Sequence, residues 1–349
     1  MKQTRFILLS LCSVFVLLSS CSKEANPEEG IYGPGIFIAN EGTFNQSNGS
    51  VSFISRSTYQ SYNDIYAKAN GGAVLGDVVQ SVYVHKDKVY VVVNNSQKVQ
   101  VVNCENFTYS GVISDRNLPR YMAFNNQRGY LTEWQNFGEN GRVSIINLIN
   151  NSVAKQITVG KLPEQLLIYD KMLYVTNSND STVSVIDLTY EILDHTFTVG
   201  DWPTGIVQDA NHKLWILCSG IPAWAGTSTN GSLVRYNPDT DEIELRLTFP
   251  SSDFQPAYLC INKTGNSLFY YYDGKVYNMG VNETVLPSNS IITTAAYGMG
   301  IDPASGYLFV TDAGDFMSEG TVKWYNVNGT FVGSATVGVA PNGFFFLEE

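Results

Sequence analysis

The chain has 349 residues, of which 44% are hydrophobic and 15% charged, and its formal net charge is −11. This length and apolar content suit one large domain with a continuous core, so nothing requires a second domain. Acidic residues outnumber basic ones by 32 to 21, and no Lys/Arg run is present to contact phosphates. These features argue against nucleic acid as a partner.

The first twenty residues have the pattern of an export signal. Two basic residues precede an apolar run over residues 6–18, which leads into Leu-Ser-Ser-Cys ending at Cys21. A charged start, a short apolar stretch and small residues at a cleavage site are typical of secretory signals. The segment resembles a bacterial lipobox, which predicts a lipoprotein signal peptide over residues 1–20 and a lipid on Cys21. The alternative is an ordinary signal in which this cysteine is incidental.

The segment after the signal is polar and predicts a lipidated, flexible tether over residues 21–30. Its early Lys-Glu pair, followed by further acids, resembles the surface-export signals of Bacteroidetes lipoproteins. That resemblance implies an outer-membrane protein that is lipid-anchored and faces the cell exterior. No apolar run of spanning length follows, so we expect contact with the membrane through the lipid anchor only.

The remaining chain, residues 31–349, repeats one pattern seven times. Each copy contains an apolar strand with a central aromatic residue, and the aromatics recur at intervals of 40 to 54 residues. A period near forty with strand-like content is typical of a propeller or another repeat array. The seven aromatic residues are Phe37, Tyr90, Tyr130, Tyr174, Trp215, Phe269 and Phe309.

Three further strands accompany the aromatic strand in each copy. The next one alternates polar and apolar residues, as at residues 143–147, and the one after it ends in a Val-Gly-x-x-Pro turn. This turn is clearest before Pro163, Pro203 and Pro341, and another apolar strand follows it. Four short strands per repeat make a propeller blade. The sequence therefore predicts an all-β fold, a seven-bladed β-propeller.

The ends of the repeat series predict how the ring closes. Taking the strand after the Val-Gly-x-x-Pro turn as the first of each blade, the N-terminal copy lacks this strand. The chain ends on residues 342–347, which have the pattern of the missing strand. We therefore expect the C-terminal strand to join the N-terminal blade, which removes the exposed edges that make β proteins aggregate.

Two sets of turns meet on one face of a propeller: those into each first strand and those between the second and third strands. In this chain both sets are rich in aromatic and amide side chains, with long insertions at 41–48 and 220–231. Extra loop length in repeat proteins commonly marks the binding side. Some of these aromatics could instead cap the core. The candidate ligand-binding residues are Phe44, Arg120, Tyr121, Trp134, Gln135, Phe137, Gln165, Trp202, Trp224, Phe254, Tyr297 and Phe316.

The placement of the histidines argues against catalysis. His85, His195 and His212 are the only three, and each is expected away from the loop-rich face. Without histidine, a general acid or base would have to be a carboxylate with a raised pKa. The sequence contains no Gly-x-Ser-x-Gly turn and no Gly-rich phosphate loop. We therefore expect no catalytic residue and no enzyme activity.

The cysteines and acidic turns give little support for a metal or a catalytic cofactor. Cys104, Cys218 and Cys260 lie in or beside strands without metal-ligand spacing, so we expect buried free thiols. The Asn-Ser-Asn-Asp turn at residues 177–180 could supply oxygens to calcium, although such turns usually just connect strands. The prediction is that no metal is bound, with calcium at this turn as the alternative.

The combination of lipobox, acidic tether and blade signatures (Tyr-Val-x-Asn, Val-Ser-Val-Ile-Asp and Val-Gly-x-x-Pro) resembles the YncE-like surface lipoproteins of Bacteroidetes. Within them the chain looks most like the BtuG group. The resemblance covers essentially the whole mature chain and implies capture of cobalamin or a related corrinoid outside the cell. It also implies delivery to a TonB-dependent outer-membrane transporter. Cobalamin would then be a ligand and not a catalytic cofactor, and the candidate residues above rest on loop position and chemistry.

Two other classes of function stay open on the sequence. A surface glycan-binding propeller would also present aromatic platforms, and it would bind polysaccharides while ignoring corrinoids. A propeller lactonase or lyase would need a calcium–carboxylate cluster or a histidine near the central channel, and the sequence offers neither in a specific pattern.

Overall fold

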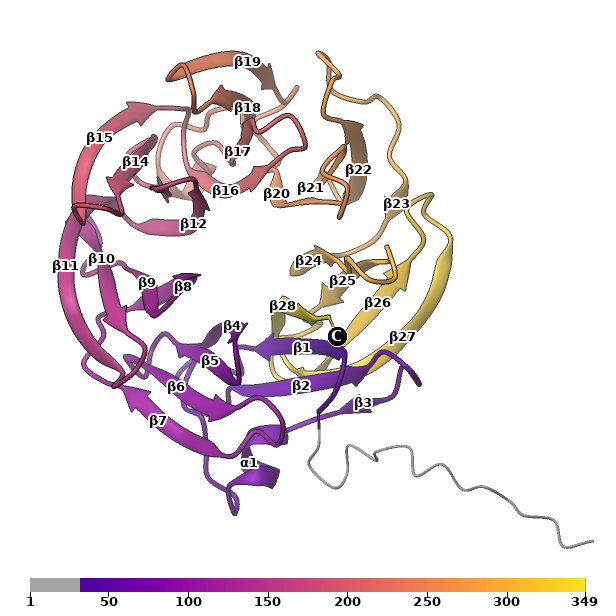
Figure 1. Ribbon diagram of the computed structural model, residues 1–349. Helices are drawn as coiled ribbons and strands as arrows, with labels where there is room; N and C mark the ends of the chain where they lie inside the picture. Colours follow the sequence, from indigo (N-terminus) through magenta and orange to yellow (C-terminus); the bar gives the residue numbers. More distant parts are fainter. Residues whose placement is uncertain (1–31, 349) are drawn as a thin grey trace, which may run out of the picture.

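A computed structural model describes residues 32–348, which form seven four-stranded antiparallel sheets arranged in a ring (Figure 1). The predicted all-β, seven-bladed propeller is confirmed.

Each blade is given below from the central axis outward. Blade 1 contains β28 (Pro341–Leu347), β1 (Gly35–Asn40), β2 (Ser50–Ser55) and β3 (Ser61–Tyr62). Blade 2 contains β4 (Val79–His85), β5 (Lys88–Val93), β6 (Lys98–Asn103) and β7 (Tyr109–Ile113). Blade 3 contains β8 (Pro119–Asn125), β9 (Arg128–Glu133), β10 (Asn140–Asn147) and β11 (Ser152–Lys161).

The other four blades repeat this order. Blade 4 contains β12 (Pro163–Tyr169), β13 (Met172–Asn177), β14 (Thr182–Asp187) and β15 (Ile192–Thr198). Blade 5 contains β16 (Pro203–Gln208), β17 (Leu214–Cys218), β18 (Ser232–Asn237) and β19 (Glu242–Thr248). Blade 6 contains β20 (Ala257–Ile261), β21 (Ser267–Tyr272), β22 (Lys275–Gly280) and β23 (Ile292–Thr293). Blade 7 contains β24 (Gly298–Ile301), β25 (Leu308–Asp312), β26 (Glu319–Tyr325) and β27 (Phe331–Val339).

Helical structure is limited to two short segments in the described residues. The helix α1 (Ile65–Ala69) follows β3 and packs at the outer edge of blade 1, where Ile65 and Tyr66 are buried. A single 3-10 turn, η2 (Ala223–Ala225), lies in the insertion of blade 5. Within residues 32–348, no helix has the length and apolar character needed to cross a membrane.

The core lies between the blades and not within them. Each of the seven apolar clusters joins two adjacent blades around the ring. In β5, Tyr90 and Val92 pack toward blade 3, whereas Val89, Val91 and Val93 pack toward blade 1. Successive side chains of a strand point to opposite faces of the sheet, so one apolar strand serves two clusters. All seven aromatic residues of the repeat are buried, with at most 3% exposure.

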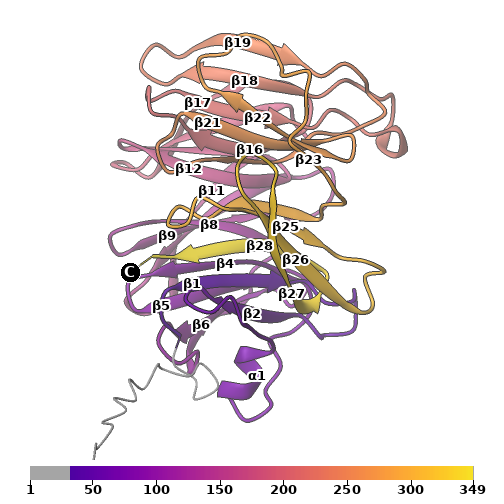
Figure 2. The same ribbon diagram turned by 90° about the vertical axis from the view of Figure 1, so that its right-hand side faces the viewer.

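The ring closes as the sequence predicts. Strand β28 pairs antiparallel with β1, with Phe345 opposite Phe37, and both ribbon views show the two strands side by side (Figures 1 and 2). On the face opposite the long loops, Arg56 contacts both ends of the ring. Its Nη2 and Nε lie 2.9 and 3.1 Å from the carboxylate oxygens of Asp302 in blade 7, and its Nη1 donates to the backbone oxygen of Leu347 at 2.7 Å.

This contact determines the charge state of Asp302, whose side chain is almost fully buried. Burial alone would raise the pKa of its carboxyl group, but hydrogen bonds from Arg56 and Ser305 lower it below the ordinary value. Through Arg56, this carboxylate, the first blade and the C-terminal strand belong to one hydrogen-bonded group.

The thiols of Cys104, Cys218 and Cys260 are free, as the sequence predicts, but only Cys218 is fully buried and the other two are half-buried. Burial raises the pKa of both Cys218 and Cys260 to about 12, so neither thiol ionises readily near neutral pH. The predicted signal peptide over 1–20, the tether over 21–30 and the lipidated Cys21 lie outside the described residues.

Deletion of residues 341–349 should open the ring. Without β28, strand β1 becomes an exposed edge and the cluster between blades 7 and 1 loses Phe344 and Phe346. We expect urea unfolding to lose its single cooperative transition, with a broader profile and a smaller m-value. The control is removal of residues 348–349 alone, which takes away one exposed ion pair and should leave the transition unchanged. A sharp, wild-type transition in the longer deletion would contradict this closure.

Candidate functional site

The two sets of turns meet on one face, which we call the loop face: the end of the ring where β4, β8, β12, β16, β20, β24 and β28 begin. The Val-Gly-x-x-Pro turns on this face share one backbone conformation. The residue before the proline has a φ between 48° and 54° at Leu162, Trp202 and Ala340. Residues other than glycine adopt this left-handed conformation rarely, and here the following proline begins the strand.

A β-bulge follows this turn in six of the seven first strands. In blade 3 it places Arg120 and Tyr121 opposite the single residue Thr132 of β9. A bulge inserts one extra residue and redirects the side chains around it. In blades 4 and 6 the same register shift sets two consecutive residues opposite one, and the side chains at these positions differ between blades.

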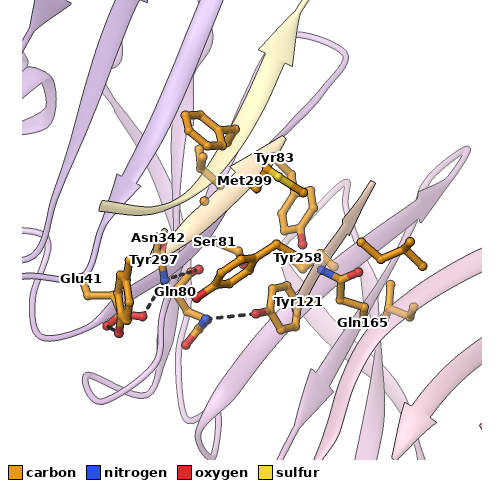
Figure 3. Close-up of a pocket in the computed structure, with 16 residues that line it drawn as sticks. Glu41, Gln80, Ser81, Tyr83, Tyr121, Gln165, Tyr258, Tyr297, Met299 and Asn342 are labelled. Atoms are coloured by element: carbon orange, nitrogen blue, oxygen red, sulfur yellow. Dashed lines mark hydrogen bonds between the residues drawn. The ribbon is translucent and has the colours of Figure 1, made fainter. Parts of the chain in front are cut away.

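A cavity of about 450 Å³ opens at the centre of the loop face (Figure 3). The first residues of the inner strands give it a rim of amide and phenol groups, to which the β1–β2 loop adds one carboxylate. The rim residues are Glu41, Gln80, Tyr121, Gln165, Tyr258, Tyr297 and Asn342. Farther along the same strands the lining becomes apolar. The apolar residues are Val82, Met122, Leu166, Leu259, Met299 and Phe344.

Arg120 lies beside the rim, and its guanidinium is engaged by neighbouring side chains of the protein. Nε and Nη2 of Arg120 lie 3.2 and 3.1 Å from the two carboxylate oxygens of Glu164, and its Nη1 donates to the side-chain oxygen of Gln80. Its guanidinium carbon also lies 4.1 Å from the ring centroid of Trp134. Burial raises the pKa of Glu164, against the opposing effect of Arg120. Burial disfavours the arginine charge as well, but Glu164, Tyr121 and Glu41 together outweigh burial and raise the pKa of Arg120.

The second polar group at the rim centres on Glu41. Its Oε2 accepts a hydrogen bond from the Tyr297 hydroxyl at 2.8 Å, and its Oε1 accepts from Nδ2 of Asn342 at 2.6 Å. The same Nδ2 donates to the backbone oxygen of Gln80 at 3.1 Å. None of the ion pairs formed among residues 32–348 involves Glu41. Its negative charge is therefore held by neutral donors.

Three tyrosines at the rim are kept protonated. Burial, and after it Glu164, raises the pKa of Tyr121, while burial and then Glu41 raise the pKa of Tyr297. Burial raises the pKa of Tyr258 to about 12, with smaller effects from Tyr271 and Glu41. Each hydroxyl therefore remains a hydrogen-bond donor across the physiological pH range.

Around the cavity, aromatic side chains of the loop face form contacting pairs. Ring centroids are 5.7 Å apart for Trp134 and Phe137, 5.5 Å for Trp202 and Trp224, and 4.8 Å for Tyr297 and Phe316. In each pair the first ring is partly buried and supports a second that faces solvent. Phe137 is 76% exposed and Trp224 is 81% exposed. Exposed rings held by fixed rings form a preorganised apolar surface.

The structure divides the predicted ligand-binding residues into two groups. Tyr121, Gln165 and Tyr297 line the cavity, and Arg120 lies beside it. The others surround it on the loops and at the starts of the strands: Phe44, Trp134, Gln135, Phe137, Trp202, Trp224, Phe254 and Phe316. Of these, Phe44 is 66% exposed, and Phe254 contacts the buried Tyr272 with ring centroids 6.0 Å apart.

Four rim residues are missing from the predicted set: Glu41, Gln80, Tyr258 and Asn342. Tyr258 follows Pro256 by two positions, as Tyr121 follows Pro119 and Gln165 follows Pro163. Aligning the repeats on the proline would have identified it. Glu41 begins the 41–48 insertion, so the sequence places it on the loop face, but the proline alignment does not identify it because it reaches the cavity from the β1–β2 loop.

The three histidines lie away from the cavity. His85 ends β4 and stacks on Phe124 at 4.9 Å, His195 lies in the outer strand β15, and His212 lies in the turn after β16. In residues 32–348, no three His, Cys, Asp or Glu side chains come together as a metal site would require. In the turn proposed as the calcium alternative, Asp180 accepts a hydrogen bond from the backbone nitrogen of Lys161 at 2.7 Å.

These features define a closed seven-bladed β-propeller with a cavity of phenol and amide groups at the centre of one face. The chain belongs to the family described as Domain of unknown function (DUF5074), which matches it over residues 34–346. No curated protein sequence matches the chain.

Several solved structures share the fold. A quinonprotein alcohol dehydrogenase-like protein from Bacteroides thetaiotaomicron is 16% identical, with a TM-score of 0.65 over 90% of this chain and 78% of that one. A functionally unknown protein from Desulfotomaculum acetoxidans is 12% identical, with a TM-score of 0.64 over 90% and 98%. A protein from Lactobacillus plantarum is 13% identical, with a TM-score of 0.65 over 90% and 99%. At these identities the likeness establishes the fold alone.

The Arg120–Glu164 pair should be strongly coupled in stability. Replacing Arg120 with Met leaves Glu164 buried without its partner, and we expect the free energy of unfolding to fall by about 3–5 kcal/mol. The double variant Arg120→Met/Glu164→Gln should lose less than the sum of the two single losses, because neither charge is then left unpaired. Urea unfolding of the four proteins measures this coupling. Additive losses would contradict the coupling.

Proposed function

We propose that this protein captures a corrinoid such as cobalamin on its loop face. The observation that carries the proposal is the arrangement of exposed aromatic pairs around a cavity with a mainly amide and phenol rim. The arginine beside this cavity, Arg120, is paired with Glu164. Such a surface suits a large neutral ligand that has apolar faces and a hydrogen-bonding periphery. A corrinoid has both, in its macrocycle and in the carboxamides around it.

Each part of the ligand has a chemical counterpart on the loop face. Exposed rings such as Trp224 and Phe137 would cover the apolar face of the macrocycle with a large contact area. The side chains of Gln165, Tyr121 and Tyr258 would pair with carboxamides, which both donate and accept hydrogen bonds. The binding surface is built on a closed ring, so little ordering entropy is lost when the ligand binds.

The cavity volume suggests how such a ligand would lie. About 450 Å³ is near the small end of the range for ligand pockets, so it would take one edge or a few side chains of a corrinoid. The macrocycle would then lie across the rim, against the aromatic pairs. In this arrangement the protein holds the periphery of the intact ligand and leaves its cobalt ligands in place.

The proposed setting is the outside of the outer membrane. The lipobox-like segment ending at Cys21 and the polar tether over residues 21–30 support attachment through a lipid, with the propeller facing the cell exterior. A ligand captured there needs a route inward, and we propose a TonB-dependent outer-membrane transporter as the partner. The protein would act by binding and transfer, without catalysis.

Cyanocobalamin should bind the protein that lacks its signal peptide, with one site per chain in calorimetry. The variant Trp224→Ala/Phe137→Ala should weaken binding by about 100-fold, because each removes an exposed anchor worth roughly 1.4 kcal/mol or more. The matched control is Tyr190→Ala/Ile149→Ala, which removes two equally exposed apolar residues from turns on the opposite face and should leave affinity unchanged.

Trp134 and Trp202 belong to the same surface, but each is partly buried and supports its neighbour, so their substitution would also disturb the fold. An oligosaccharide panel in the same experiment tests the glycan alternative, which the exposed rings also favour. Binding of glycans with indifference to cyanocobalamin would overturn the corrinoid proposal and retain the loop face as the site.

Replacement of Cys21 with Ser should abolish lipid attachment. In a bacterial host with an outer membrane, the wild-type chain should incorporate labelled palmitate and sediment with membranes, whereas the variant should do neither. Cys12→Ser is the matched control, since Cys12 lies in the apolar run of the signal and not at its end. Equal labelling of the wild type and Cys21→Ser would show that the cysteine is incidental.

A further inference from the structure

We propose that the central cavity selects uncharged carboxamides and that Glu41 excludes carboxylates from it. This inference rests on the proposed function and deepens it, because a corrinoid is surrounded by carboxamides, any of which can be replaced by a carboxylate. The cavity would then distinguish a corrinoid whose inserted side chain is a carboxamide from one in which that side chain has been hydrolysed to a carboxylate. Three observations support the inference. They are the charges in the cavity lining, the hydrogen-bonding groups available at its rim, and the effect of Glu41 on the pKa values of nearby tyrosines.

The cavity offers no positive charge to balance an anion. Its lining contains no Lys, Arg or His, and the nearest cation, Arg120, is bound by both carboxylate oxygens of Glu164. The only ionised group on the rim is Glu41, which is held by Tyr297 and Asn342 without a basic partner. A carboxylate in this cavity would meet a like charge and lose its water, both of which are costly.

The hydrogen-bonding groups left over at the rim suit a carboxamide. Oδ1 of Asn342 is buried and has no hydrogen-bond partner, so it is an unused acceptor at the rim, and a shift of this side chain toward the cavity would let it accept from an amide NH₂. The hydroxyl of Tyr258 can donate to an amide oxygen, and so can that of Tyr121, which already accepts from Nε2 of Gln80 at 3.3 Å. A carboxylate has no N–H, so it would leave Asn342 unpaired in a buried place.

The raised pKa values of three tyrosines indicate that negative charge is disfavoured in the cavity. Glu41 contributes to the raised pKa of Tyr121, Tyr258 and Tyr297, in each case after burial. These three hydroxyls come from three different blades and face the same space (Figure 3). The influence that opposes a phenolate at all three positions opposes a ligand carboxylate at the same place.

The test compares cyanocobalamin with its separated monocarboxylates, in each of which one propionamide is hydrolysed to a propionate. Calorimetry with the wild-type protein should show at least one isomer binding about tenfold more weakly than cyanocobalamin, which corresponds to about 1.4 kcal/mol. Glu41→Gln removes the negative charge while its amide can still bond Asn342 and Tyr297. In this variant the affinity ratio between cyanocobalamin and that isomer should fall toward one.

The matched control is Glu139→Gln, which removes a carboxylate of the same loop face outside the cavity and should leave the ratio at its wild-type value. Equal binding of every isomer to the wild type would overturn the carboxamide selectivity while leaving corrinoid capture standing. A ratio that persists in Glu41→Gln would overturn the role of Glu41. Absence of cyanocobalamin binding would overturn the proposed function and this inference together.

Discussion

Packing on both faces of the second strand in every blade is the interaction on which the rest of this structure depends. Alternate residues of β5, for example, belong to two different apolar clusters, one on each side of the blade. No blade can bury both faces of its own second strand, so each requires two neighbours and the series has to return to its start. Strand β28 and the Arg56 contacts with Asp302 and Leu347 complete that return.

The closed ring then allows irregular backbone and buried charge at the loop face. Left-handed residues such as Leu162 and Trp202, each followed by a bulge, are conformations that persist where surrounding structure determines them. The Arg120–Glu164 pair is likewise held by Gln80 and Trp134 from neighbouring strands. The loop face is therefore preorganised, because packing between the blades stabilises its unfavourable backbone conformations.

This preorganisation gives the loop face a definite chemical character. Partly buried rings support exposed ones, so the apolar surface is both large and fixed. At the centre, Arg120 is paired with Glu164 beside the cavity, and the carboxylate of Glu41 in the cavity lining is hydrogen-bonded by neutral donors. Apolar area with an amide and phenol rim favours ligands that are large, neutral and rich in hydrogen-bonding groups, and it disfavours anions.

The amino-acid sequence by itself determined the propeller, the number of blades and the closing strand, because strand periodicity and the aromatic repeat are local signals. It also identified the loop face, and with it Tyr121, Gln165 and Tyr297. The pairing of Arg120 with Glu164, the partition of the aromatics into supporting and exposed rings, and the place of Glu41 were decided only by the tertiary structure. Arg120 and Glu164 come from adjacent blades, and Glu41 meets Tyr297 of the neighbouring blade. Each aromatic pair forms within one blade, between residues whose approach the loop conformation decides. Neither spacing nor composition encodes those distances.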